Sequence, residues 1–254
     1  MDPVSPPATP PRMSAWVLET LSKFNIAQRT PAWYEARKGR LTASDVAAAI
    51  GENPHLSANG LLKRKINPPV FKGNCATEWG QKYEDVAIAR YERLTGEVVW
   101  PCGLFVHPEH SCIAGSPDGL TNSGKLIEVK CPYRKKLEPR CPDIYYPQVQ
   151  TCLEIIGCEA CDFIQYIPAT TWGTEQIIII TVPRNRAWFR KHVSTMIDFA
   201  RRLKDAEAMG PPEPAPKKLK RERKPQPFMI DVHCDSVVIN VVPDNRTKAG
   251  VAFG

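Results

Sequence analysis

The sequence lacks any apolar run long enough to cross a membrane. Its longest apolar stretch, Ile177–Val182, has the length of a β-strand, whereas a membrane-spanning helix needs about 20 apolar residues. Residues 1–12 are rich in proline and lack the apolar block of a secretory signal. An internal repeat is also missing. These absences argue against a membrane, secreted or repeat protein, and we expect an intracellular chain.

The cysteines lack the pattern of a disulfide framework or of a zinc site. There are nine of them, an odd number, and in an intracellular chain we expect reduced thiols. Cys158 and Cys161 have the spacing of a metal-binding pair, but no second pair accompanies them. Small buried thiols are therefore the better interpretation.

Acidic residues are in the minority, with 27 Asp and Glu against 34 Lys and Arg and a formal net charge of +7. Such a balance suits a polyanionic partner such as nucleic acid. Part of the excess lies in the run Lys217–Lys224. That run fits a nuclear localisation signal, an additional DNA contact or a solvated linker, so the compartment is either the nucleus or the cytoplasm.

The 25 prolines cluster near the two ends of the chain. We therefore predict an N-terminal tail with a short helix at residues 1–29, a folded domain at 30–208, a linker at 209–227 and a C-terminal tail at 228–254 that adds at most one strand. The folded part begins with helices, continues with strands and ends with helices. This order predicts an α/β or α+β domain in which a central mixed sheet is flanked by helices.

The strongest chemical signal is Gly-Ser-Pro-Asp118-Gly followed by Ile-Glu128-Val-Lys130. Glu128 and Lys130 are two residues apart on a predicted strand, so their side chains share one face. A hairpin would bring Asp118 beside Glu128. Adjacent carboxylates repel unless a cation lies between them, and hard oxygen ligands suit Mg²⁺ or Mn²⁺. Lys130 completes a hydrolytic site, and the carbonyl group of Val129 is a further candidate ligand.

Each motif alone has a plainer interpretation. A Glu and a Lys on one strand face are usually solvated, and Ser-Pro-Asp-Gly is usually a turn. Glu84, in the predicted helix from Thr77 to Thr95, is either a surface acid or a further metal ligand. Gln148 and Gln150 lie about 200° apart on the next predicted helix, so only one of them can face the site.

Several blocks together resemble the phage lambda exonuclease family, also called YqaJ-type viral recombinases. The resemblance covers residues 30–205 and depends on five blocks in order: 33–44, 76–84, 115–119, 126–132 and 148–150. It implies a restriction-endonuclease-like PD-(D/E)xK core and a Mg²⁺-dependent enzyme, with Mn²⁺ as a substitute. That enzyme would digest one strand of duplex DNA from the 5′ end in recombination or repair.

The resemblance also implies roles for individual residues. Asp118, Glu128 and Glu84 match the metal-binding acids, and Lys130 and Gln150 match the catalytic lysine and glutamine. A pocket for the 5′-terminal phosphate would consist of Arg37, Ser44 and Ser116, although a surface charge and a helix cap are the plainer interpretations of the first two. The family further suggests duplex DNA ends as the partner, a single-strand annealing protein and a homotrimer.

Two other functions remain open from the sequence. One is an endonuclease of the same fold, and the other is a DNA-end-binding module that has lost catalysis. The matched acids and the lysine argue against the inactive module, and the block with Arg37 and Ser44 favours end recognition over internal cleavage.

Overall fold

The computed structural model of the chain describes residues 15–22, 26–68, 75–133, 136–170, 173–209 and 239–243. The main element is a six-stranded sheet in the order β2-β5-β6-β7-β8-β9. Its strands are β2 (Val99–Pro101), β5 (Gly119–Thr121), β6 (Leu126–Lys130), β7 (Ala160–Ile167), β8 (Gln176–Pro183) and β9 (Ile239–Pro243). Pairing is parallel for β6 with β7 and for β8 with β9, and antiparallel elsewhere. The mixed sheet predicted from the sequence is therefore confirmed.

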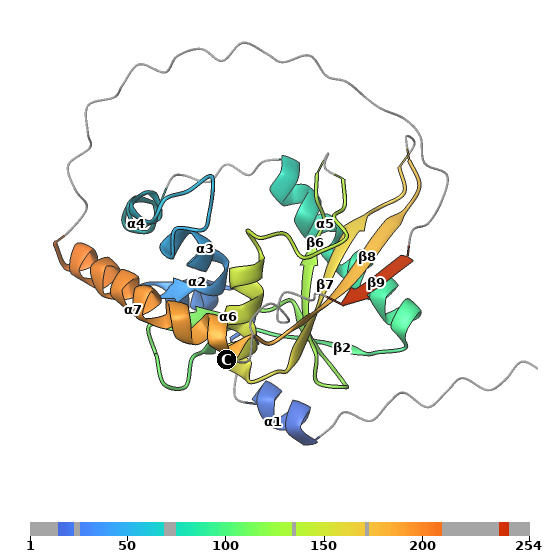
Figure 1. Cartoon of the computed structure of the whole chain (residues 1–254), viewed down its shortest axis with the longest axis horizontal. Coiled ribbons are helices and arrows are strands. Elements are labelled where there is room, and N and C mark those ends of the chain that lie inside the picture. Colours follow the sequence, from blue (N-terminus) through green and yellow to red (C-terminus); the bar gives the residue numbers. More distant parts are fainter. Residues whose placement is uncertain are drawn as a thin grey trace, which may run out of the picture.

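A small sheet lies beside the large one. It has the order β1-β4-β3 and consists of β1 (Leu41–Thr42), β3 (Phe105–Val106) and β4 (Ile113–Gly115). Around both sheets lie α1 (Ala15–Ser22), α2 (Pro31–Arg37), η1 (Ala43–Asp45), α3 (Val46–Ala49), α4 (Ala58–Ile66), α5 (Cys75–Thr95), α6 (Tyr146–Ile156) and α7 (Arg186–Met209). Helix α5 covers one face of the large sheet, and α6 and α7 lie on the other side (Figure 1).

Strand β6 separates two hydrophobic clusters because its side chains alternate between the faces of the sheet. Ile127 and Val129 pack towards α5, where they join Tyr91. Leu126 packs towards α6, where it joins Leu153. Glu128 and Lys130 therefore share the α6 face, as their spacing predicts. Since both faces are covered by helices, the Glu128 carboxylate is buried rather than solvated.

The turn before β5 places Asp118 at the start of a close strand pairing. The Asp118 amide donates to the carbonyl oxygen of Ile127 at 3.1 Å. Gly119 follows, and a Cβ atom there would lie 2.3 Å from Cγ1 of Val99. Only glycine allows β2 and β5 to approach this closely, so Gly119 fixes the position from which the Asp118 side chain extends.

Glycine also ends the helix that carries the two glutamines. Gly157 follows α6 with φ of 84°, and its amide donates to the carbonyl oxygen of Leu153. This left-handed cap closes the helix where the sequence predicts its end. The predicted helix over Thr77–Thr95 is also present, and begins at Cys75.

Both ends of the chain contribute one described element. Helix α1 lies in the N-terminal tail, and β9 pairs with β8 within the C-terminal segment in which one strand is expected. The predicted linker at 209–227, with the run Lys217–Lys224, lies outside the described residues apart from Met209 at the end of α7. Among the described helices, none is long and apolar enough to span a membrane.

Candidate active site

Asp118, Glu128 and Lys130 come together at one end of β6. The Lys130 ammonium group donates to Oε1 of Glu128, and Oδ2 of Asp118 accepts from the Val129 amide at 2.7 Å. The Glu128 side chain is 3% exposed and that of Lys130 is 26% exposed. The hairpin and the strand alternation thus bring these side chains together, as the sequence predicts.

Glu128 has one oxygen atom that the protein leaves without a partner. Oε1 accepts from both Lys130 and Gln148, whereas Oε2 is buried and has no hydrogen-bond donor among the described residues. A buried carboxylate oxygen without a partner is costly. Two neighbouring carboxylates, one of which has a buried oxygen without a donor, form a donor set that suits a hard divalent cation such as Mg²⁺ or Mn²⁺.

The electrostatics of Asp118 and Glu128 also favour a bound cation. Burial, and then the charge of Glu128, raise the pKa of Asp118 to about 7, although Lys130 and the Val129 amide oppose this. For Lys130, burial disfavours the charged form, but the carboxylates of Glu128 and Asp118 outweigh burial and raise its pKa. The site therefore has an excess of negative charge that one lysine does not neutralise, and a cation would relieve it.

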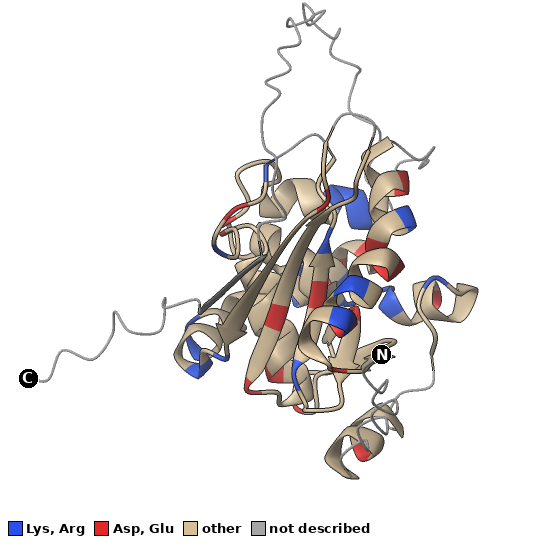
Figure 2. Cartoon of the chain, turned by 90° about the vertical axis from the view of Figure 1, so that its right-hand side faces the viewer, with Lys and Arg blue, Asp and Glu red and all other residues tan. Residues whose placement is uncertain are grey.

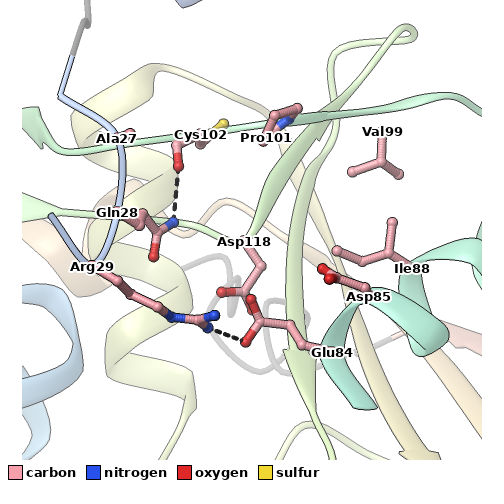
Figure 3. A pocket seen from close by; sticks show the side chains of 10 residues that line it. All are labelled: Ala27, Gln28, Arg29, Glu84, Asp85, Ile88, Val99, Pro101, Cys102 and Asp118. Carbon is pink, nitrogen blue, oxygen red and sulfur yellow. Dashed lines mark hydrogen bonds and ion pairs between the residues drawn. The ribbon is translucent and has the colours of Figure 1, made fainter. Parts of the chain in front are cut away.

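Glu84 reaches the same region from α5. A cavity of about 550 Å³ is lined by Glu84 and Asp118 together with Gln28 and Arg29, and the two carboxylates point towards each other in it (Figure 3). Burial and the nearby Asp118 charge raise the pKa of Glu84, while Arg29 opposes the shift. Glu84 is thus not a solvated surface acid, which was the plainer interpretation of the sequence.

A complete set of metal ligands is not yet assembled. Within the described ranges, no group of three or more His, Cys, Asp or Glu side chains is gathered closely enough to hold a metal ion. The contacts explain this: Glu84 turns to Arg29, with Nη2 and Oε2 2.6 Å apart, and Oε1 of Glu128 is taken by Lys130.

The structure does not bring Gln150 to the two carboxylates, and Gln148 lies beside Glu128 instead. Nε2 of Gln148 donates to Oε1 of Glu128 at 2.5 Å. Gln150 is 1% exposed and points elsewhere: it donates to the Pro183 carbonyl oxygen and accepts from the Asn185 amide. The rotation of α6 on the sheet decides between the two glutamines, and Gln150 instead joins α6 to the end of β8.

The residues expected to bind a terminal phosphate are linked through Trp33 and Thr42. The Arg37 guanidinium group stacks on Trp33 at 4.1 Å, and Nε1 of Trp33 donates to Oγ of Ser116 at 2.9 Å. Nη2 of Arg37 also donates to Thr42, whose hydroxyl lies 3.5 Å from that of Ser44. The three predicted residues thus belong to one connected group near Asp118, although none of them contacts another directly.

The sequence did not identify three residues of this region. Gln28 and Arg29 line the cavity, and Trp33 joins Arg37 to Ser116. Trp33 stood in a matched block, which was a usable signal. Gln28 and Arg29 precede the helix start at Thr30 and carry no motif of their own. The strands of the large sheet carry few acidic and basic residues (Figure 2). A charged residue on one of these strands is therefore a usable signal for a functional site.

Comparison with known proteins agrees with this geometry. A family model described as the YqaJ-like viral recombinase domain matches residues 32–159, just over half of the chain.

Two viral proteins are similar to this chain. One, from Acanthamoeba polyphaga mimivirus, is 28% identical over 168 residues, covering 59% of this chain and 30% of the viral protein. The other, from African swine fever virus, is 28% identical over 170 residues, covering 53% and 48%. The chain thus spans half or less of these relatives.

Solved structures give the same picture. The crystal structure of an alkaline exonuclease from Laribacter hongkongensis matches with a TM-score of 0.58 and 28% identity, covering 69% of this chain and 93% of that one. The same enzyme in complex with dAMP matches equally well. A phage-related exonuclease from Haemophilus somnus matches with a TM-score of 0.51 and 16% identity, over 65% and 93% of the chains, which supports the fold alone.

Proposed function

The chain belongs to the YqaJ-like viral recombinase domain family, and on this basis we propose that it is a metal-dependent exonuclease that digests duplex DNA from its 5′ ends. The single observation that carries this proposal is the unpartnered Oε2 atom of Glu128, buried beside Asp118 and Lys130. A buried carboxylate oxygen without a donor, next to a second carboxylate, is the arrangement that a divalent metal ion requires of its ligands.

In the proposed reaction, Asp118, Glu128 and Glu84 would hold Mg²⁺, with the Val129 carbonyl group as a further ligand and Mn²⁺ as a substitute. Such an ion would polarise the phosphoryl oxygen and lower the pKa of a water molecule. Lys130, held on Glu128, places a positive charge beside the phosphate as negative charge develops. Gln148 orients Glu128 through its amide group.

End recognition is assigned to Arg37, Ser44 and Ser116. An arginine can bind a phosphate through two donors, and stacking on Trp33 fixes the orientation of the guanidinium plane. Burial lowers the pKa of Arg37, with the charge of Asp45 opposing that effect, yet an arginine remains charged at neutral pH. A 5′-phosphate would therefore meet a fixed cation with two hydroxyl groups near it.

The biological setting is also a proposal. Viral relatives and a recombinase family support a role in DNA recombination or repair. As the family resemblance implies, we further propose a single-strand annealing protein as partner and a trimer as the assembled form. The formal net charge of +7 suits a DNA substrate.

The decisive experiment compares three DNA substrates in the presence and absence of Mg²⁺. We expect degradation of linear duplex with a 5′-phosphate, slower degradation of 5′-hydroxyl duplex and no cleavage of a closed circle. Lys130→Ala should abolish degradation while end binding in Ca²⁺ persists. Intact DNA in every Mg²⁺ reaction would favour an inactive end-binding module, and cleavage of the circle would favour an endonuclease. Degradation by Lys130→Ala at the unmodified rate would contradict the proposed site.

A further inference from the structure

Arg29 holds a position in the cavity that the sequence blocks do not explain. It lies outside the residues matched by the family model, which begin at residue 32. Its Nη2 atom nevertheless lies 2.6 Å from Oε2 of Glu84, and its side chain extends into the cavity that Asp118 also lines (Figure 3). The side chain of Arg29 is 47% exposed, so solvent and ions can reach the pair.

The backbone of Arg29 adopts a left-handed conformation. Its φ is 65°, and among the described residues it is the only one other than glycine with a positive φ. This left-handed conformation is disfavoured for arginine. Residues kept in such conformations are concentrated at functional sites, where surrounding contacts hold them in place.

Neighbouring contacts do hold the turn. Nε2 of Gln28 donates to the carbonyl oxygens of Cys102 and Pro117, both at 2.9 Å. The Thr30 hydroxyl donates to the Ala27 carbonyl oxygen at 2.8 Å and caps α2. Since Pro117 directly precedes Asp118, these bonds tie the turn to the loop that carries a proposed metal ligand. Arg29 is thereby directed at Glu84.

Two of the acids at the site each form an ion pair with a basic side chain. Lys130 neutralises Glu128, and Arg29 neutralises Glu84. We propose that Arg29 is a built-in counter-cation that competes with the divalent metal ion for Glu84, so that metal loading requires the Arg29–Glu84 pair to open. This inference rests on the proposed function, because it takes Glu84 to be a metal ligand.

The test measures metal binding without DNA and without catalysis. Isothermal titration calorimetry of the full chain with Mn²⁺ compares the unmodified protein with Arg29→Ala. Loss of an exposed competing ion pair should tighten Mn²⁺ binding by about threefold to fivefold. Arg29→Lys keeps the charge and should stay within about twofold of the unmodified affinity. The difference should shrink at high salt, because ions screen the pair.

Two further variants keep the result interpretable. Arg186→Ala removes an exposed arginine that is paired with Glu159, changes the net charge equally and should leave Mn²⁺ affinity unchanged. Arg29→Gly removes the guanidinium group but accepts a positive φ without strain, so it should fold and bind Mn²⁺ as tightly as Arg29→Ala.

The possible failures are distinct. If the Arg29→Ala and Arg29→Gly variants bind Mn²⁺ no more tightly than the unmodified chain, or if the Arg186→Ala variant tightens binding equally, Arg29 is not a competitor. If the unmodified chain binds no Mn²⁺ at all, the proposed metal site itself is wrong and this inference is overturned with it.

Discussion

Two buried acids lie on neighbouring strands, yet the protein treats them differently. Glu128 on β6 and Asp162 on β7 are each 2% exposed. Both oxygens of Asp162 have partners: Oδ2 accepts from Tyr91 at 2.7 Å and from Lys125 at 3.1 Å, and Oδ1 accepts from Thr181 at 2.6 Å. Glu128, by contrast, keeps Oε2 without a donor among the described residues.

The difference teaches how to separate a structural acid from a functional one. Burial is equal, so burial does not discriminate between them. An unpaired oxygen beside a second carboxylate does. Oε2 of Glu97 is also buried without a donor among the described residues, but Glu128 in addition lies beside Asp118, whereas both oxygens of Asp162 already accept hydrogen bonds. Asp162 faces α5 through Tyr91, and Glu128 faces α6 through Gln148, so one sheet carries a structural acid on one face and a proposed catalytic acid on the other.

The largest expected effect is on catalysis at Glu128. Glu128→Gln keeps the shape of the side chain but removes the charge that would bind a cation, so the rate of DNA degradation should fall by about 10²- to 10³-fold. Thermal unfolding in EDTA should shift less than in Asp162→Asn, because the substitution removes a buried carboxylate charge with an unpaired oxygen, while Oε1 can still accept from Lys130 and Gln148. A large loss of stability with retained nuclease activity would show that Glu128 is a structural acid like Asp162.

The opposite result is expected at Asp162. Asp162→Asn places an amide nitrogen among donors from Tyr91, Lys125 and Thr181, which should lower the free energy of unfolding by about 2–4 kcal/mol. Denaturant unfolding measures this. The exposed Asp198→Asn on α7 is the matched control and should change stability by at most about 0.5 kcal/mol. If Asp162→Asn were as stable as the parent but inactive, the comparison would be reversed.

The stability of the fold in EDTA should depend on pH through Asp118, which lies beside Glu128. Because the fold raises the pKa of Asp118 from the usual 3.8 to about 7, the folded state retains a proton that the unfolded state releases. The stabilisation is therefore full below pH 4 and is lost as pH rises through 7. Relative to Asp118→Asn, the unmodified chain should lose about 1–3 kcal/mol of unfolding free energy between pH 4 and 8. A constant difference across that range would contradict the shift.

The smallest expected effects are those of substitutions at Gln148 and Gln150, one of which should lower activity and the other stability. Gln148→Leu removes a hydrogen bond to Glu128 and should lower nuclease activity about tenfold with little change in stability. Gln150→Leu leaves the Pro183 carbonyl group and the Asn185 amide without partners and should cost about 1–3 kcal/mol of stability with activity retained. Activity assays and thermal unfolding of both variants measure this. The reverse pattern would restore Gln150 to the site.

Sequence by itself determined the core of the site. The period of two along a strand puts Glu128 and Lys130 on one face, and the turn residues around Asp118 predict the hairpin that brings it near. These are local rules, so they hold whatever surrounds them. The order of helices and strands likewise determined the mixed sheet with helices on both faces.

Tertiary structure decided the rest. Whether Gln148 or Gln150 faces Glu128 depends on the rotation of α6, which the burial of Val149 and Leu153 against the sheet fixes. Whether Oε2 of Glu128 has a partner depends on every neighbouring side chain. The position of the Arg29 side chain depends on a left-handed turn. Gln28 holds that turn through contacts with loops about 75 and 90 residues away in the chain. Side-chain pairing between distant segments follows from packing, and no local pattern in the sequence encodes it.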